Sequence, residues 1–143
     1  MALEIPPTWL AAFPGTRFFP DHRLLTWHPR GVLNLIQTEA MIRWMEAVEP
    51  ELGNFNRFAD LSGLTEVHLR SEEITALVKR RRGSYSGEPV TTVLLVGTPL
   101  VYGIAAMYER LMAGTPIHVQ IVVRLTSACR ILGVTPDVLI RGT

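Results

Sequence analysis

The strongest constraint in this sequence is one apolar stretch, residues 90–114, with no charged residue between Glu88 and Glu109. Its first half, residues 90–96, is apolar and rich in β-branched side chains, which is typical of a buried strand. Gly97, Thr98 and Pro99 come next, and apolar residues then recur at helical spacing. Because proline suits the first turn of a helix, the stretch predicts a central strand, a tight turn and a packed helix.

A membrane span is the competing interpretation, because a transmembrane helix needs roughly 20 apolar residues. Threonines, glycines and Pro99 in the middle of the run are poor material for one continuous helix. Pro99 would break such a helix, since proline lacks the backbone N–H donor and clashes with the preceding turn. We therefore expect no transmembrane segment.

Length and composition bound the remaining possibilities. The 143 residues predict one domain, and a hydrophobic share of 48% is ample for a core. The formal net charge of +1 gives no general attraction to nucleic acid or anionic membranes. The single cysteine, Cys129, excludes an internal disulfide and fits a reducing compartment. Glu4 and three prolines interrupt the pattern of a signal peptide, so we expect a cytoplasmic protein.

The N-terminal half is expected to begin with an apolar arm over residues 1–16, which could cover a domain edge or a second copy. Short strands over residues 17–19, 24–28 and 31–35 suggest a β-meander. Thr38 is a candidate N-cap for a helix that Pro50 and Gly53 end. A strand over residues 55–61 follows, and then a connector over residues 64–69 that could form a short irregular strand.

The C-terminal half alternates between the two kinds of element. Ser71 is a candidate N-cap for a helix whose acidic first turn and basic last turn both suit the helix dipole. After residues 90–114, a strand over residues 117–123 and a short helix capped by Thr126 complete the domain, residues 17–133. Residues 134–143 are expected to form a tail, with a short strand over residues 137–141 as the alternative.

The order of these elements predicts the fold class. Once the first helix appears, strands and helices alternate, which implies parallel strands joined by right-handed crossovers. We predict an α/β domain with a mixed sheet of four to five strands and about four helices.

Two segments carry a family resemblance. Residues 102–109 contain Tyr102, Gly103, Ala105, Met107, Tyr108 and Glu109, and this pattern resembles one found in STAS-like domains, above all in bacterial single-domain proteins grouped with STAS and the CRAL-TRIO lipid-transfer proteins. Residues 59–64 (ADLSGL) resemble the segment that ends the central strand of anti-sigma-factor antagonists. The resemblance covers residues 17–132. It implies a STAS-like fold and a non-enzymatic signalling or protein-interaction domain.

The resemblance is incomplete at one functional position. Anti-sigma-factor antagonists carry a phosphorylated serine in a D-S-S-G motif just before the second helix. Here the segment reads Leu69, Arg70, Ser71 and Glu72, without the aspartate and glycine. Ser71 is therefore a candidate phosphosite or a plain helix cap, and Glu72 would repel a phosphate there.

Several residues are candidates for a ligand site. Tyr102 and Tyr108, with Trp44 and methionines of the first helix, could line an apolar pocket or pack in a core or dimer interface. Asp60 and Ser62 end a strand, where α/β sheets gather ligands, but they are also good turn residues. Thr98 lies at the start of a helix, beside Gly97 and near Gly103, and could contact an anion or serve packing.

Residues 79–82 form the densest basic run: Lys79, Arg80, Arg81 and Arg82. They could bind an anion or be a solvated helix end. No aromatic residue alternates with these charges, so nucleic-acid binding is not expected. The four histidines lack metal spacing, no catalytic triad or acid–base pair is visible, and no cofactor motif occurs. We expect no metal, cofactor or catalytic residue.

Two functions remain from the sequence. The first is a signalling or protein-interaction module with a regulatory protein partner. The second is a carrier or sensor of an apolar small molecule or lipid. The apolar arm and the segment around Val101, Tyr102 and Tyr108 also suggest a homodimer.

Overall fold

A computed structural model describes residue 13 and residues 15–140 of the chain. Its main sheet has five strands in the order β1-β2-β4-β6-β7. Strands β1 and β2 pair antiparallel, and every other neighbouring pair is parallel. The bounds are β1 Thr16–Phe19, β2 Leu24–Trp27, β4 Asn56–Asp60, β6 Val90–Leu95 and β7 Ile117–Val122. The predicted α/β class with a mixed sheet is confirmed.

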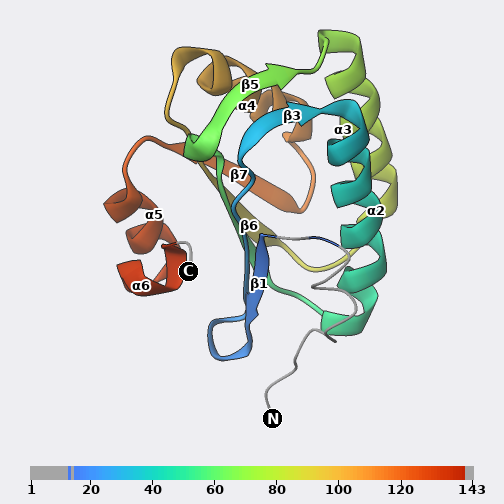
Figure 1. Cartoon of the computed structure of the whole chain (residues 1–143). Coiled ribbons are helices and arrows are strands. Elements are labelled where there is room, and N and C mark those ends of the chain that lie inside the picture. Colours follow the sequence, from blue (N-terminus) through green and yellow to red (C-terminus); the bar gives the residue numbers. More distant parts are fainter. Residues whose placement is uncertain (1–12, 14, 141–143) are drawn as a thin grey trace.

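Helices cover both faces of this sheet. In Figure 1, α2 and α3 lie on one side and α5 and α6 on the other. Helix α4 packs on α3 and on β7, so it belongs to the α2 and α3 side. The bounds are α2 Leu35–Leu52, α3 Ser71–Ser84, α4 Pro99–Met112, α5 Leu125–Leu132 and α6 Pro136–Leu139, with the 3₁₀ turns η1 Pro20–His22 and η2 Leu61–Gly63.

Two apolar layers cover the two faces of the sheet, because successive side chains of a strand point to opposite faces. Leu24, Phe58 and Val93 pack under α5 and α6, with Ala128 and Leu139 from those helices. The opposite face meets α2, α3 and α4. The inward face predicted for the last helix is confirmed, since Ala128 is buried there and Cys129 and Leu132 pack against the same cluster.

The third N-terminal strand does not extend a meander, and that expectation is wrong. Strand β3, Gly31–Asn34, leaves the main sheet and pairs in parallel with β5, Leu64–His68, as a separate two-stranded sheet. Gly31 has φ +74°, a left-handed conformation that favours glycine and turns the chain out of the main sheet. The irregular strand expected over residues 64–69 is confirmed as β5.

In three helices the N-cap lies before the residue predicted from sequence. Asn34 caps α2 in a capping box with Gln37, whose backbone N–H donates to Asn34 Oδ1 at 2.9 Å. Thr38 therefore lies one turn inside the helix, and its hydroxyl donates to the Asn34 carbonyl at 2.8 Å. Pro50 also lies inside α2, and the helix ends at Gly53.

The other two N-caps, unlike Asn34, are residues without a typical capping side chain. Arg70 is the N-cap of α3, so Ser71 is the first helical residue, and the Arg70 N–H donates to Glu73 Oε1 at 2.8 Å. Arg124, not Thr126, is the N-cap of α5. In each case an unfavourable N-cap residue is tolerated because the tertiary packing of the helix outweighs local propensity.

Residues 90–114 form a strand, a turn and a helix, as predicted. Strand β6 ends at Leu95, Thr98 caps α4 by accepting a hydrogen bond from the Val101 N–H at 3.3 Å, and Pro99 is the first helical residue. Among the described residues, no helix is long and apolar enough to cross a membrane.

The first and last residues that the structure describes pack against the domain. Of the apolar arm, Ile5, Trp9 and Leu10 lie outside the described residues, but Phe13 stacks on Trp44 with ring centroids 5.8 Å apart. Residues 136–139, expected in a tail or strand, form α6 instead. Its Val138 and Leu139 are buried in the core, so this segment is packed against the sheet.

Candidate functional site

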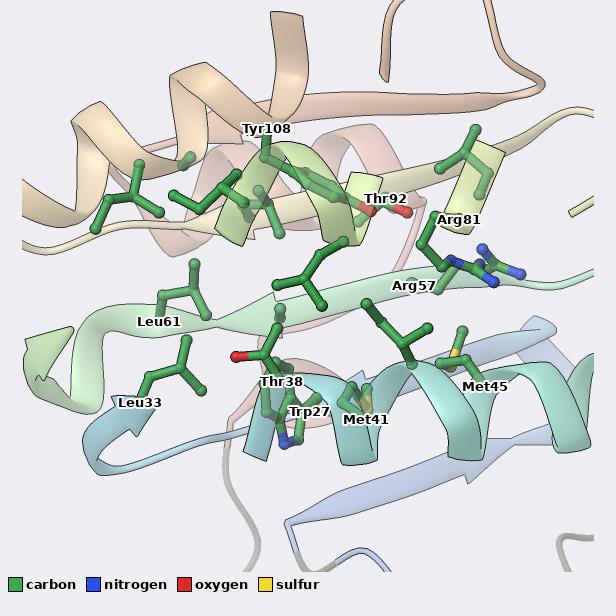
Figure 2. Close-up of a pocket in the computed structure, with 18 of the residues that line it drawn as sticks. Trp27, Leu33, Thr38, Met41, Met45, Arg57, Leu61, Arg81, Thr92 and Tyr108 are labelled. Carbon is green, nitrogen blue, oxygen red and sulfur yellow. The ribbon is translucent and has the colours of Figure 1, made fainter. Parts of the chain in front are cut away.

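A pocket of about 200 Å³ lies between the main sheet and the helices α2, α3 and α4. Figure 2 shows its side chains converging from these elements. Most of the lining is apolar, and its members include Leu33, Met41, Met45, Leu61, Leu77 and Ile104. Apolar lining with a few polar groups is the usual character of a small-molecule site.

The register of the sheet decides which strand residues form the pocket floor. Arg57 of β4 lies beside Leu25 of β2 and Thr92 of β6. Two residues further along, Ala59 lies beside Trp27 and Leu94. Since alternate residues of a strand share a face, these two rows point into the same space, and all six residues line the pocket.

A buried ion cluster forms one end of the site. Arg57 Nη2 donates to Glu49 Oε2 at 2.8 Å, and Arg81 Nη2 donates to the same oxygen at 2.6 Å. Arg81 Nη1 also donates to Glu49 Oε1 at 3.0 Å, and Arg57 Nε donates to the Phe55 carbonyl at 2.9 Å. Both arginines are buried, with 7% and 4% of their surface exposed. Both line the pocket, whereas Glu49 does not.

Burial and the shared carboxylate act on these arginines in opposite directions. Desolvation lowers the pKa of Arg57, the like charge of Arg81 adds to this effect, and Glu49 opposes it. Burial is also the largest influence on Arg81, but hydrogen bonding and attraction to Glu49 together outweigh it and raise the pKa of Arg81. Arginine keeps its charge in proteins, so the cluster carries two positive charges and one negative charge.

Tyr108 supplies a hydroxyl to this end of the pocket. Figure 2 shows its oxygen beside that of Thr92 and on the same side of the pocket as Arg57 and Arg81. Burial raises the pKa of Tyr108, although the charges of Arg81 and Arg57 oppose this shift. Tyr108 keeps some accessible surface because it borders the pocket.

The sequence candidates divide between the pocket, the core and the surface. Tyr108 lines the pocket. Trp44 is buried in the core with Met45, Val48 and Leu52 and does not line it. Tyr102 is 50% exposed and lies outside it. Thr98 is also exposed, and its hydroxyl caps α4.

Asp60 and Ser62 lie at the carboxyl end of β4, outside the pocket. The Ser62 hydroxyl donates to Asp60 Oδ1 at 2.5 Å, and the Ser62 N–H donates to the same oxygen at 3.0 Å. This is a self-contained turn. Gly97 packs on it so closely that a Cβ there would lie 3.3 Å from Ser62 Cα. Gly103, the other glycine near Thr98 in the sequence, is exposed, and a Cβ there would meet nothing within 4 Å.

The basic run does not form one patch. Arg81 is buried at the pocket, while Arg80 is exposed and pairs with Glu46 at 2.6 Å. Arg82 Nη1 donates to the carbonyls of Leu111 and Ala113, both at 3.0 Å, at the end of α4. Lys79 is exposed. Helical geometry separates adjacent residues by about 100°, so a run of four cations cannot share one face.

Sequence reasoning missed Glu49 and Arg57, although a signal for each was present. Glu49 continues the inward stripe of α2 that contains Ile42, Met45 and Leu52, at helical spacing. Arg57 occupies an inward position of β4 between Phe55 and Ala59. A charge at an inward position of an apolar stripe marks a buried polar site, because such a charge needs a partner.

Comparison with known proteins adds a likeness of fold. No protein-family model matches the sequence, and no curated protein matches it. One solved structure, an uncharacterized protein from the DUF3478 family with a SpoIIAA-like fold from Shewanella loihica PV-4, is similar to this chain at 14% identity and a TM-score of 0.49. The match covers 76% of this chain and 83% of that one.

Proposed function

We propose that this protein binds a small apolar molecule in the pocket and acts as its carrier or sensor. The observation that carries this proposal is the apolar pocket of about 200 Å³ between the sheet and the three helices. An apolar cavity of about 150 Å³ is enough to bind benzene, so this space accepts an aromatic ring or a short aliphatic chain. Met41 and Met45 line it, and their flexible side chains adapt to ligand shape.

A cavity-filling variant tests the proposal. Ala105 lines the pocket from α4 and is buried, whereas Ala106 does not line it. Ala105→Leu should fill the space and Ala106→Leu should serve as the matched control. The measurement is an NMR titration of the labelled protein with 1-octanol. We expect saturable shifts at pocket residues in the wild type and in Ala106→Leu, and a loss of affinity of at least about tenfold in Ala105→Leu.

Native mass spectrometry provides the second measurement. Protein purified gently from cells that express it should carry a small molecule that is absent from Ala105→Leu. Saturable octanol binding that is equal in both alanine variants would place the ligand outside the pocket. Absence of both octanol binding and a copurified molecule would overturn the proposed function.

A protein-interaction module is the second candidate, and an exposed apolar surface favours it. Leu100 and Tyr102, at the start of α4, are 59% and 50% exposed. A homodimer would bury such residues. Light scattering at micromolar concentration tests this, with Leu100→Ser/Tyr102→Ser as the variant. A wild-type particle of the monomer mass, 16.0 kDa, would exclude the dimer.

The regulatory version of this candidate depends on Ser71. The residue is exposed in the first turn of α3, where the helix dipole favours a phosphate but Glu72 and Glu73 repel one. Intact-mass analysis of protein from its native cells should reveal a phosphorylated fraction that Ser71→Ala removes. Protein that is unmodified under all growth conditions would exclude this switch.

A further inference from the structure

We propose that the molecule bound in the pocket is a monoanionic amphiphile, with a carboxylate head between Arg57, Arg81 and Tyr108 and an apolar tail toward Leu33 and Leu61. This assignment rests on the proposed function and specifies the ligand class of the same site. It follows from the charge balance of the buried cluster and from the residues that line the two ends of the pocket.

The buried cluster carries one uncompensated positive charge. Arg57 and Arg81 contribute two positive charges, and Glu49 contributes one negative charge. Within the described part of the chain, Glu49 is the only carboxylate within ion-pair distance of either arginine. Glu46, whose carboxylate accepts a hydrogen bond from Arg80, attracts Arg81 less than Glu49 does. Since an unpaired buried charge is costly, a bound anion would stabilise the site.

Both arginines line the pocket, whereas Glu49 does not. Each guanidinium has five N–H donors. Arg57 donates to Glu49 and to the Phe55 carbonyl, and Arg81 donates to Glu49 and to Ser84 Oγ. Each guanidinium therefore keeps donors for a second acceptor group. Tyr108, which interacts with Arg81, adds a hydroxyl donor at the same place.

The remaining lining defines the rest of the ligand. Figure 2 shows Arg57 and Arg81 at one end of the pocket and Leu33 and Leu61 at the other, with Trp27 and Met41 between the ends. A molecule that satisfies both ends has a charged head and an apolar tail. The size of the pocket limits that tail to a short chain or a single ring, because a comparable cavity holds one benzene.

The same charge count favours a carboxylate over a phosphate monoester. A carboxylate carries one negative charge and neutralises the cluster. A phosphate monoester carries about −1.5 to −2 at neutral pH and would leave the buried site negative. Arginine pairs with carboxylates through two parallel hydrogen bonds, so the fork geometry suits this head group.

Four probes with one common tail test the assignment: octanoate, 1-octanol, octylammonium and octyl phosphate. Their affinities can be measured by NMR titration of the full chain at pH 7 and constant ionic strength. We expect octanoate to bind at least about tenfold more tightly than octanol, octylammonium to bind most weakly, and octyl phosphate to bind less tightly than octanoate.

Variants separate the head-group contact from the tail contact. Arg81→Met should reduce octanoate affinity to that of octanol and leave octanol binding intact. Arg80→Met is the matched control, because it removes the same charge from the next residue, outside the pocket. Tyr108→Phe, which retains the ring and folds without burying a new charge, should weaken octanoate binding by threefold or more with octanol unchanged.

The outcomes distinguish this assignment from the proposed function. Equal affinities for octanoate and octanol would overturn the anionic head and leave an apolar ligand in place. Tighter binding of octyl phosphate than of octanoate would replace the carboxylate by a phosphate. Failure of all four probes to bind would overturn the proposed function as well. If Arg80→Met and Arg81→Met weakened octanoate binding equally, the preference for octanoate would come from the surface charge of α3, and the assignment of the head group to the pocket would be wrong.

Discussion

Arg81 of α3 donates two hydrogen bonds to Glu49 of α2, at 2.6 and 3.0 Å, and thereby joins the two helices inside the apolar layer. Arg57 of β4 donates to the same carboxylate and ties the sheet to both helices. The ring of Tyr85 lies 5.2 Å from the Arg57 guanidinium and 5.8 Å from that of Arg81. The cluster therefore connects three elements and forms one wall of the pocket at the same time.

The first prediction concerns the stability of this cluster. Glu49→Ala should lower the free energy of unfolding by about 3 kcal/mol, because it leaves two buried guanidinium groups without a counter-ion. Urea unfolding of the two proteins at pH 7 measures the difference. Glu46→Ala, which removes a carboxylate from the same helix, is the control and should lower stability far less, since Arg80 is exposed and solvent screens that pair.

An equal loss of unfolding free energy in Glu49→Ala and Glu46→Ala would contradict the argument that burial makes the Glu49 ion pairs more important for stability. A small loss in Glu49→Ala would show that the arginines relax toward solvent when the carboxylate is absent. In that case octanoate should not stabilise the variant. A bound carboxylate that restored stability to Glu49→Ala would instead show that the pocket accepts an anion in place of Glu49.

The second prediction concerns acid pH. The hydrogen bond from Arg80 lowers the pKa of Glu46 from its ordinary value of 4.5. As the pH falls, the unfolded chain therefore takes up this proton before the folded chain does. The stabilisation that Glu46 contributes is present above pH 4.5 and is lost as the pH falls through the folded pKa. The stability difference between wild type and Glu46→Gln should be constant from pH 7 to about pH 5 and shrink below it. Urea unfolding at pH 7, 5, 4 and 3 checks this, and a constant difference down to pH 3 would count against it.

The third prediction concerns alkaline pH. Burial raises the pKa of Tyr108 above its ordinary value of 10.0. As the pH rises, the unfolded chain loses the phenolic proton first, so the contribution of the neutral phenol is present below pH 10 and is lost as the pH rises through the folded pKa. Wild-type stability should fall more steeply between about pH 9 and 11 than that of Tyr108→Phe.

Urea unfolding at intervals of half a pH unit measures these slopes. Absorbance of the phenolate near the ultraviolet maximum of tyrosinate follows ionisation in the same samples. Tyr102→Phe is the control, because it removes the phenolic hydroxyl of an exposed tyrosine on the same helix. Only Tyr108→Phe should change the pH dependence of stability. Parallel profiles for wild type and Tyr108→Phe would show that the hydroxyl is in contact with water.

The sequence predicts more of the fold than of the site, and the reason lies in the range of the interactions. Residues 90–114 predict β6, the turn and α4 because β-branched residues, Gly97 and Pro99 act locally. The departure of β3 toward β5 depends on pairing between distant segments, which no local pattern encodes. The charged residues of the site also come from distant segments. In the sequence, Arg81 stands out only as part of a basic run, and its burial follows from its position on the inward face of α3.

The last prediction compares two glycines near the start of α4. A methyl group at Gly97 would lie 3.3 Å from Ser62 Cα, so Gly97→Ala forces the turn at the end of β4 away from β6. Such overpacking costs about 1 kcal/mol or more. Gly103 lies inside α4 with no atom within 4 Å of a Cβ, so Gly103→Ala should stabilise the protein by about 1 kcal/mol through helix propensity. Urea unfolding of both variants tests whether their unfolding free energies change in opposite directions. Destabilisation by Gly103→Ala would mean that a second copy or a partner packs against this face of α4, whereas unchanged stability of Gly97→Ala would mean that the Asp60–Ser62 turn can move without cost.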